Sequence, residues 1–171
     1  MNFLNALNSA ILIVSISLTA EAQEHVLPDA ARDVLVRYSS ALNRGDCEAM
    51  LELASPEIIS RLHRFEGGKD GFCEGIRYFH DIGIVDSLGE PLAIKSEGPY
   101  RMAMVETIRL AGGAPGFVDA RGIYVLHSSD SGKHWWVLDN SCVNYEWMTI
   151  VYPPYDGDPP IPGGSETLPE R

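Results

Sequence analysis

Residues 122–145 read GIYVLHSSDSGKHWWVLDNSCVNY, and this stretch decides the fold. Apolar runs at 123–126 and 135–138 flank a polar segment at 128–133, and β-branched and aromatic residues fill both runs. Such residues suit the pleated, half-buried surface of a strand. Between the runs, Asp130 can hydrogen-bond to its own backbone, and Gly132 can adopt the positive φ of a tight reversal. The stretch predicts a β-hairpin with one face packed on helices and the other facing solvent, a ligand or a partner.

The chain ahead of this hairpin has helical periodicity. Apolar residues recur at intervals of three and four from residue 28 onward, and Gly45 is a suitable helix end. Asp46 can cap a second helix, and Ser55 followed by Pro56 has the pattern of a further helix start. Another helix is expected over about residues 70–80, with three side chains facing inward: Phe72, Ile76 and Phe79.

Beyond Gly83 the apolar pattern changes from the period of a helix to that of a strand. Residues 91–97, 101–109 and 117–127 have strand patterns, and the Gly-rich segment 111–116 separates two of them. Helices that precede a run of strands predict an α+β domain with an antiparallel sheet, because a βαβ repeat would alternate the two element types.

The ends of the chain differ from this central part. An apolar run at 10–18 followed by Ala20-Glu21-Ala22 is typical of a secretory signal peptide over residues 1–22, which predicts export to the periplasm or the outside. A permanent anchor is the alternative, although the run is shorter than the roughly 20 residues of a membrane-spanning helix. Residues 23–152 then form one domain. The Pro-rich tail 153–171 is expected to be extended or disordered, with Tyr152 and Tyr155 holding its start to the sheet.

The charge and the cysteines limit the function classes. The chain has a formal net charge of −11, which argues against a nucleic-acid partner and, after cleavage, against a membrane surface, since both require basic residues. In an exported chain, Cys47, Cys73 and Cys142 can form one disulfide in any of three pairings, or remain buried thiols. The histidines lack metal-ligand spacing, so no metal site and no cofactor are expected.

Two segments carry a family resemblance. RYSSALNRGD at 37–46, together with GGKDG at 67–71 and IRYF at 76–79, resembles the nuclear-transport-factor-2-like superfamily, in particular its ketosteroid-isomerase and polyketide-cyclase branch. The resemblance implies three N-terminal helices packed on a strongly curved antiparallel sheet, which form a cone around a pocket. That superfamily includes isomerases, dehydratases, cyclases, ligand binders and interaction modules, so the fold alone does not choose a function.

The resemblance also suggests site residues. Tyr38 falls where the isomerases place the tyrosine that donates a hydrogen bond to a developing oxyanion. Their carboxylate base corresponds to Leu62, which cannot move a proton, whereas the adjacent His63 can act as a base. A buried tyrosine with a satisfied hydroxyl is the alternative for Tyr38.

Asp139 and Glu106 are a second candidate pair, because they can meet across neighbouring strands and share a proton. The alternative is that they are solvated carboxylates or form salt bridges beside Arg101 and Arg109.

The aromatic side chains of residues 135–152 allow two functions. They can line an apolar pocket, for which Tyr38, Tyr78 and Trp136 are the expected ligand-binding residues, or form a partner or homodimer interface on the outer sheet face. The sequence therefore predicts an exported domain that binds a small apolar ligand or a protein partner without a complete catalytic set. The alternative is a lyase or isomerase with Tyr38 as oxyanion donor and His63 as general base.

Overall fold

The computed structural model describes residues 26–64, 66–139, 145–155 and 165–167. Residues 1–22, predicted to be a signal peptide, and Cys142 lie outside these ranges, so the predictions made for them stay predictions. Helices come first along the described chain: α1 Asp29–Asn43, α2 Cys47–Leu51, α3 Pro56–Arg61, the short 3₁₀ helix η1 Leu62–Arg64 and α4 Gly68–Asp81. The later elements are β1 Val85–Glu97, β2 Tyr100–Leu110, β3 Ala120–Ser128, β4 Trp136–Leu138, α5 Tyr145–Val151 and β5 Ser165–Thr167.

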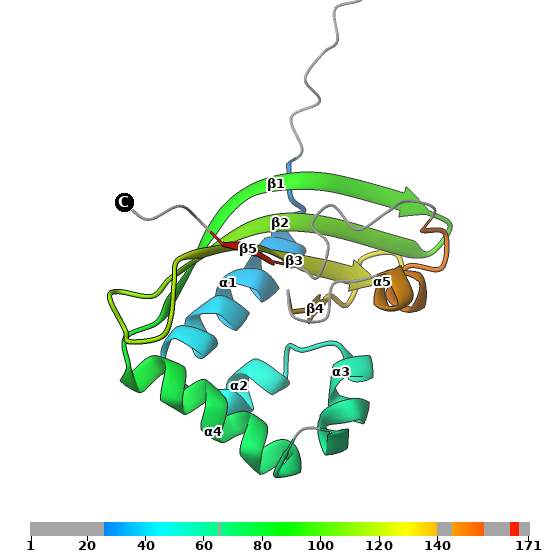
Figure 1. The fold of residues 1–171 in the computed structure, drawn as a ribbon. Coiled ribbons are helices and arrows are strands. Elements are labelled where there is room, and N and C mark those ends of the chain that lie inside the picture. The colour runs from blue at the N-terminus through cyan, green and yellow to red at the C-terminus, as the bar shows by residue number, and fades with distance from the viewer. Residues whose placement is uncertain (1–25, 65, 140–144, 156–164, 168–171) are drawn as a thin grey trace, which may run out of the picture.

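The strands form one antiparallel sheet (Figure 1). β1 pairs with β2 and β2 with β3, and the β1–β2 register shifts at Pro91. The other edge of β3 is shared by two short strands, because β4 pairs with residues 125–127 and β5 with residues 120–122. Helices followed by an antiparallel sheet confirm the predicted α+β class.

The predicted hairpin is present as β3 and β4, with Val125 opposite Leu138 and His127 opposite Trp136. Its turn is closed by the Asp130 carboxylate, which accepts hydrogen bonds from the backbone N–H groups of Lys133 and His134, both at 3.0 Å. The hydrogen bonds from His134 hold the pKa of Asp130 below its ordinary value. The predicted role of Asp130, to close the turn by bonding to nearby backbone groups, is therefore confirmed.

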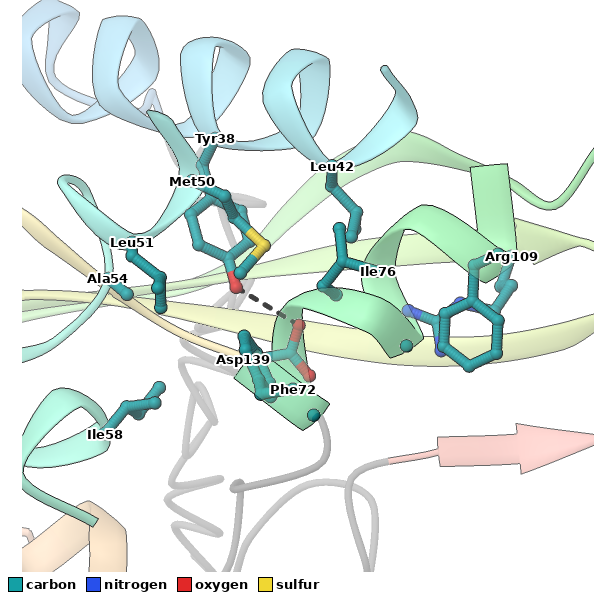
Figure 2. A pocket seen from close by; sticks show the side chains of 13 residues that line it. Tyr38, Leu42, Met50, Leu51, Ala54, Ile58, Phe72, Ile76, Arg109 and Asp139 are labelled. Carbon is teal, nitrogen blue, oxygen red and sulfur yellow. Dashed lines mark hydrogen bonds between the residues drawn. The ribbon is translucent and has the colours of Figure 1, made fainter. Parts of the chain in front are cut away.

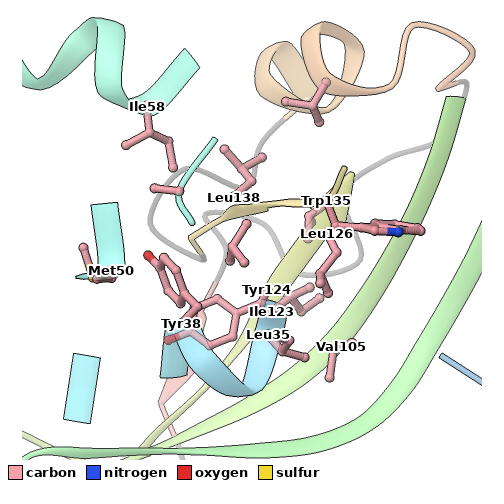
Figure 3. Close-up of a cluster of buried hydrophobic side chains, with 14 of the residues drawn as sticks. Leu35, Tyr38, Met50, Ile58, Val105, Ile123, Tyr124, Leu126, Trp135 and Leu138 are labelled. Atoms are coloured by element: carbon pink, nitrogen blue, oxygen red, sulfur yellow. The ribbon is translucent and has the colours of Figure 1, made fainter. Parts of the chain in front are cut away.

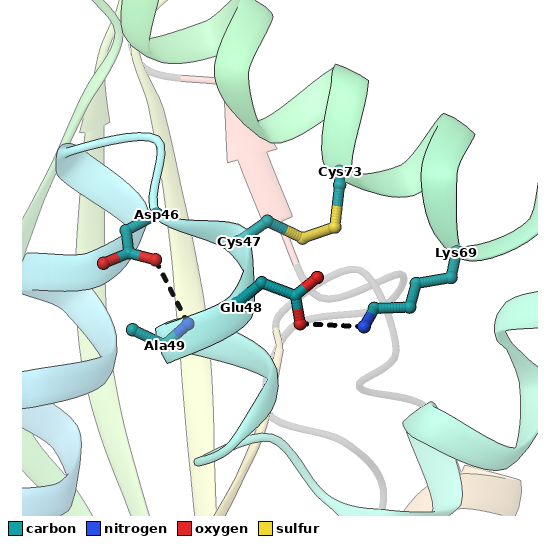
Figure 4. The surroundings of a disulfide bond; sticks show 6 residues. All are labelled: Asp46, Cys47, Glu48, Ala49, Lys69 and Cys73. Atoms are coloured by element: carbon teal, nitrogen blue, oxygen red, sulfur yellow. Dashed lines mark hydrogen bonds and ion pairs between the residues drawn. A yellow bond between two sulfur atoms is a disulfide. The ribbon is translucent and has the colours of Figure 1, made fainter.

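Local signals also position the helices. The Asp46 carboxylate accepts a hydrogen bond from the Ala49 backbone N–H at 3.2 Å and so caps α2, as predicted. Pro56 occupies the first position of α3, where its missing N–H costs nothing. A disulfide between Cys47 and Cys73, with Cα atoms 5.3 Å apart, joins α2 to α4, and a 2.8 Å ion pair between Lys69 and Glu48 lies beside it (Figure 4).

The core differs from the prediction in one respect. Side chains of both faces are buried on the central strands, including consecutive residues 102–105 of β2 and 123–128 of β3. On the hairpin arm β3 neither face is left to solvent, which differs from the expectation that one face would meet solvent, a ligand or a partner. Met148 and Val151 of α5 join the core cluster, as do Leu126 and Trp135 (Figure 3). The sequence analysis did not predict α5 and considered the aromatic residues of 135–152 only as pocket-lining or interface side chains.

The start of the tail is held to the sheet as predicted. The Tyr152 ring meets the Tyr100 ring edge-on at 6.5 Å, and the Lys95 Nζ atom lies 5.2 Å from the Tyr155 ring centroid. Residues 165–167 are extended, but their pairing with β3 was not foreseen. No helix in the described ranges has the length and apolar character required to cross a membrane.

Candidate functional site

A cavity of about 360 Å³, partly open to solvent, lies between the helices and the sheet (Figure 2). Tyr38 of α1, Arg109 of β2 and Asp139, which follows β4, supply the polar groups of its wall. The other ten lining residues are apolar and come from α1 to α4 and the α2–α3 loop: Leu42, Met50, Leu51, Ala54, Ile58, Gly71, Phe72, Gly75, Ile76 and Phe79.

Tyr38 reaches the cavity from the buried face of α1. Only 1% of the residue is exposed, and its ring packs edge-on against the Tyr124 ring with centroids 5.5 Å apart. Its hydroxyl donates a hydrogen bond to the Asp139 Oδ2 atom at 3.4 Å. A phenol and a carboxylate from positions about a hundred residues apart therefore meet at one wall of the cavity.

Arg109 is held in place by a buried carboxylate. Its Nε and Nη2 atoms donate to the two oxygens of Asp86 at 2.7 and 3.0 Å, and the Tyr124 hydroxyl donates to the same carboxylate. The hydrogen bonds to Asp86 raise the pKa of Arg109 despite the opposing effect of burial. Burial raises the pKa of Tyr124 well above its ordinary value, so this phenol stays protonated and acts as a donor.

Gly75, in the interior of α4, lines the cavity and adds to its space because it has no side chain. A Cβ atom built on Gly75 would meet no atom within 4 Å, so neither contact nor backbone strain requires glycine at this position. Gly71, one turn earlier, is different, because its Cβ would lie 1.9 Å from the Glu66 carbonyl oxygen. A glycine inside a helix costs about 0.5–1 kcal/mol relative to alanine. At Gly75 the missing side chain leaves space in the cavity wall, at this cost in helix stability.

The structure brings only one of the four expected site residues to this cavity. Tyr38 lines it, whereas His63 is exposed, with Nδ1 3.0 Å from the Ser60 carbonyl oxygen. Tyr78 is 52% exposed, and Trp136 is half-buried on β4; neither lines the cavity. The geometry thus separates Tyr38 from the proposed base, and the roles expected of His63, Tyr78 and Trp136 stay predictions.

The two carboxylates of the second candidate pair lie in different places. Asp139 lines the cavity and accepts a hydrogen bond from Tyr38, whereas Glu106 does not line it. Glu106 forms an ion pair with Arg121 at 2.8 Å, which agrees with the salt-bridged alternative, although the arginine is neither Arg101 nor Arg109. Arg109 and Gly75 were not expected at the site. A glycine in the middle of a strongly amphipathic helix was the available signal for Gly75.

A second buried polar cluster lies where the α2–α3 loop meets β3. The Nε2 atom of His127 is 2.9 Å from the Ser55 hydroxyl oxygen, and that hydroxyl donates to Glu57. Burial lowers the pKa of His127 to about 4, so the imidazole is neutral and donates to Ser55. The Ser55 side chain has no exposed surface. The cluster therefore connects the loop to the sheet and offers no nucleophile to a substrate.

Two further observations limit what function can be assigned to the protein. Within the described ranges, no group of three or more His, Cys, Asp or Glu side chains is arranged to hold a metal ion. No protein-family model matches the chain, and no curated protein matches it either. The functional argument therefore depends on the cavity.

Proposed function

We propose that this protein binds a small, mainly apolar molecule in the cavity between its helices and its sheet. The observation that supports this most strongly is the lining, in which ten apolar residues surround three residues with polar groups. Small-molecule sites are typically concave, apolar and equipped with few polar groups that orient the ligand. A volume of about 360 Å³ lies near the lower end of the usual range, which favours a compact ligand.

Binding is a better supported function than proton-transfer catalysis. The lyase or isomerase alternative requires Tyr38 and His63 to face one substrate, and His63 is exposed and absent from the cavity wall. Tyr38 and Asp139 remain suited to orient a ligand through hydrogen bonds.

A protein partner is the competing proposal, and it concerns a different surface. Tyr78 at 52% exposure and Val118 at 55% lie at the surface, and the Tyr78 ring lies 6.3 Å from the Phe117 ring. Nothing else in the described ranges indicates what would cover these side chains, whereas the cavity defines both a size and a chemistry.

The finer fold and the location of the protein belong to the same proposal. The helix-then-strand order, the bend of β1 and β2 in Figure 1 and the register shift at Pro91 support a cone-shaped fold like that of the nuclear-transport-factor-2-like superfamily. The Cys47–Cys73 disulfide supports export to an oxidising compartment, since disulfides persist there.

Filling the cavity tests the binding function. Gly75→Leu places a leucine side chain in the cavity, where a Cβ meets no atom within 4 Å. We expect the variant to fold and to lose most of its affinity for N-phenyl-1-naphthylamine, a neutral apolar fluorophore, as measured by fluorescence titration. The matched control is Glu74→Leu, which adds the same side chain on the exposed side of α4.

The control should bind the fluorophore as the wild type does. Equal affinity of Gly75→Leu and the wild type would refute binding in this cavity, as would the absence of fluorophore binding to the folded wild-type protein.

A further inference from the structure

We propose that the disulfide between Cys47 and Cys73 regulates ligand binding by holding α4 in place as a wall of the cavity. Reduction of the disulfide would lower the affinity for the ligand, and a bound ligand would in turn protect the disulfide from reduction. The inference depends on the proposed binding function and deepens it by naming a regulation of the same site. If the chain is exported as proposed, the cavity would reach its full affinity in an oxidising compartment, where disulfides persist.

The disulfide joins two helices that both line the cavity (Figure 4). Cys73 directly follows Phe72 and precedes Ile76 by three residues, and both of these neighbours line the cavity. Cys47 precedes Met50, a lining residue of α2, by three residues. The distance between α2 and α4 therefore sets the width of the cavity, and the disulfide fixes this distance with Cα atoms 5.3 Å apart.

The core alone gives α4 little support. Two of its fourteen residues are buried, Cys73 and Ile76, whereas six of the fifteen residues of α1 are buried. The helix packs mainly on α1, α2 and η1 rather than on the sheet (Figure 1). Because the hydrophobic contribution scales with the apolar area removed from water, α4 is held less firmly by burial than α1. Its position consequently depends more on the covalent link.

Two polar contacts also link α4 to its neighbouring helices, and both are exposed. The Lys69 Nζ atom lies 2.8 Å from Glu48 Oε2, with the two side chains 51% and 74% exposed. The His80 Nδ1 atom lies 2.9 Å from the Asn43 carbonyl oxygen. Exposed polar contacts contribute little to stability, since water competes for the same groups. These contacts therefore cannot replace the covalent link when the disulfide is reduced.

The two sulfur atoms are protected while the cavity wall is in place. Cys47 and Cys73 are each 3% exposed. An attacking thiolate must reach one of the sulfurs, so reduction requires α4 to move away from α2. The same movement removes contacts that a ligand would make with Met50 and Ile76. Ligand binding and reduction therefore compete, and each lowers the equilibrium constant of the other by the same factor.

The affinity of two folded forms tests the first half of the inference. Cys47→Ser combined with Cys73→Ser should raise the Kd for N-phenyl-1-naphthylamine about tenfold or more over that of the oxidised wild type, with folding checked by circular dichroism. Lys69→Gln removes the neighbouring ion pair and keeps the disulfide, so its Kd should stay within about twofold of the wild type. Equal affinity of the folded double variant and the wild type would overturn the inference.

A second control separates the cavity wall from general stability. Leu126→Ala truncates a fully buried side chain of β3 that does not line the cavity, so it lowers stability without releasing α4. The folded Leu126→Ala protein should bind the fluorophore as the wild type does. An equal loss of affinity in Leu126→Ala and in the double variant would assign the loss to stability and overturn the role of the disulfide.

Reduction of the wild type tests the second half and needs no variant. Dithiothreitol, a dithiol, breaks the bond between the Cys47 and Cys73 sulfurs, passes its two protons to the cysteine thiols and closes into a cyclic disulfide. The fluorophore at about ten times its Kd should slow this reaction about tenfold, as followed by alkylation and mass spectrometry of the two cysteine peptides. An unchanged rate would overturn the inference, and this measurement decides if the double variant does not fold.

The dependence of the reduction rate on urea shows whether α4 opens locally. Addition of about 1 M urea should change the rate little, because a local opening exposes little surface. A rate that rises as steeply with urea as global unfolding would place the reduction in the unfolded chain and overturn the role of α4.

Failure of the inference and failure of the binding function give different results. If the fluorophore binds the oxidised protein and the folded double variant equally well, the regulation is wrong and the binding function stands. If the fluorophore does not bind the folded, oxidised wild type, the binding function is refuted and the regulation with it.

Discussion

The buried imidazole of His127 predicts a pH dependence of stability. The side chain lies on β3 with 5% of the residue exposed, and burial lowers its pKa from 6.5 to about 4, although Glu57 acts in the opposite direction. In the unfolded chain the imidazole regains its ordinary pKa. As the pH falls, protons therefore bind the unfolded chain first and favour it.

The size of the effect follows from the two pKa values. This contribution to the free energy of unfolding is fully present above pH 6.5 and is lost progressively as the pH falls from 6.5 to about 4. The difference, 6.5 minus about 4, corresponds to about 3 kcal/mol in total. Of this amount, about 2 kcal/mol is lost between pH 7 and pH 5.

Urea unfolding at these two pH values measures the loss. His127→Gln keeps an N–H donor for the Ser55 hydroxyl but does not titrate, so it should lose about 2 kcal/mol less than the wild type between pH 7 and pH 5. The control is His63→Gln, an exposed histidine whose variant should follow the wild type. Parallel losses in the wild type and His127→Gln would refute the reasoning.

Two further predictions concern stability. Replacing Cys47 and Cys73 together by serine opens a link across 26 residues, which should lower the free energy of unfolding by about 3.5 kcal/mol, and a loss below about 1 kcal/mol would contradict the loop-entropy estimate. Asp86→Ala leaves the largely buried Arg109 guanidinium without its carboxylate and should cost about 3 kcal/mol in urea titrations. Asp33→Ala, which removes an exposed ion pair on α1, should cost less than about 1 kcal/mol, and equal losses in the two variants would argue against the buried pair.

Much of the fold was predictable because its signals are local. Asp46 caps α2 through a hydrogen bond three residues away, and the Asp130 turn is closed by bonds within four residues. Such contacts join residues that are close in the sequence, so they can be predicted from the sequence alone. The helix α5 was missed because its burial depends on partners elsewhere in the fold, including the core that contains Met148.

The site was less predictable for a related reason. Tyr38 carried a signal through the resemblance of residues 37–46, but its partner Asp139 lies 101 residues later and follows a strand of only three residues. His63 adjoins a position suggested by that resemblance, yet the 3₁₀ turn that buries Leu62 leaves His63 in solvent. A difference of one residue was enough to separate a buried position from an exposed position.

The sequence by itself determined the α+β class, the hairpin, the helix caps and the acidic character of the chain, because periodicity, turn chemistry and charge act over short distances. Only the tertiary structure decided which side chains share the cavity, since Tyr38, Arg109 and Asp139 come from a helix and two separate strand ends. It also decided the Cys47–Cys73 pairing and committed Arg109 to Asp86. Close packing brings these distant groups together, and no local pattern in the sequence encodes the resulting distances.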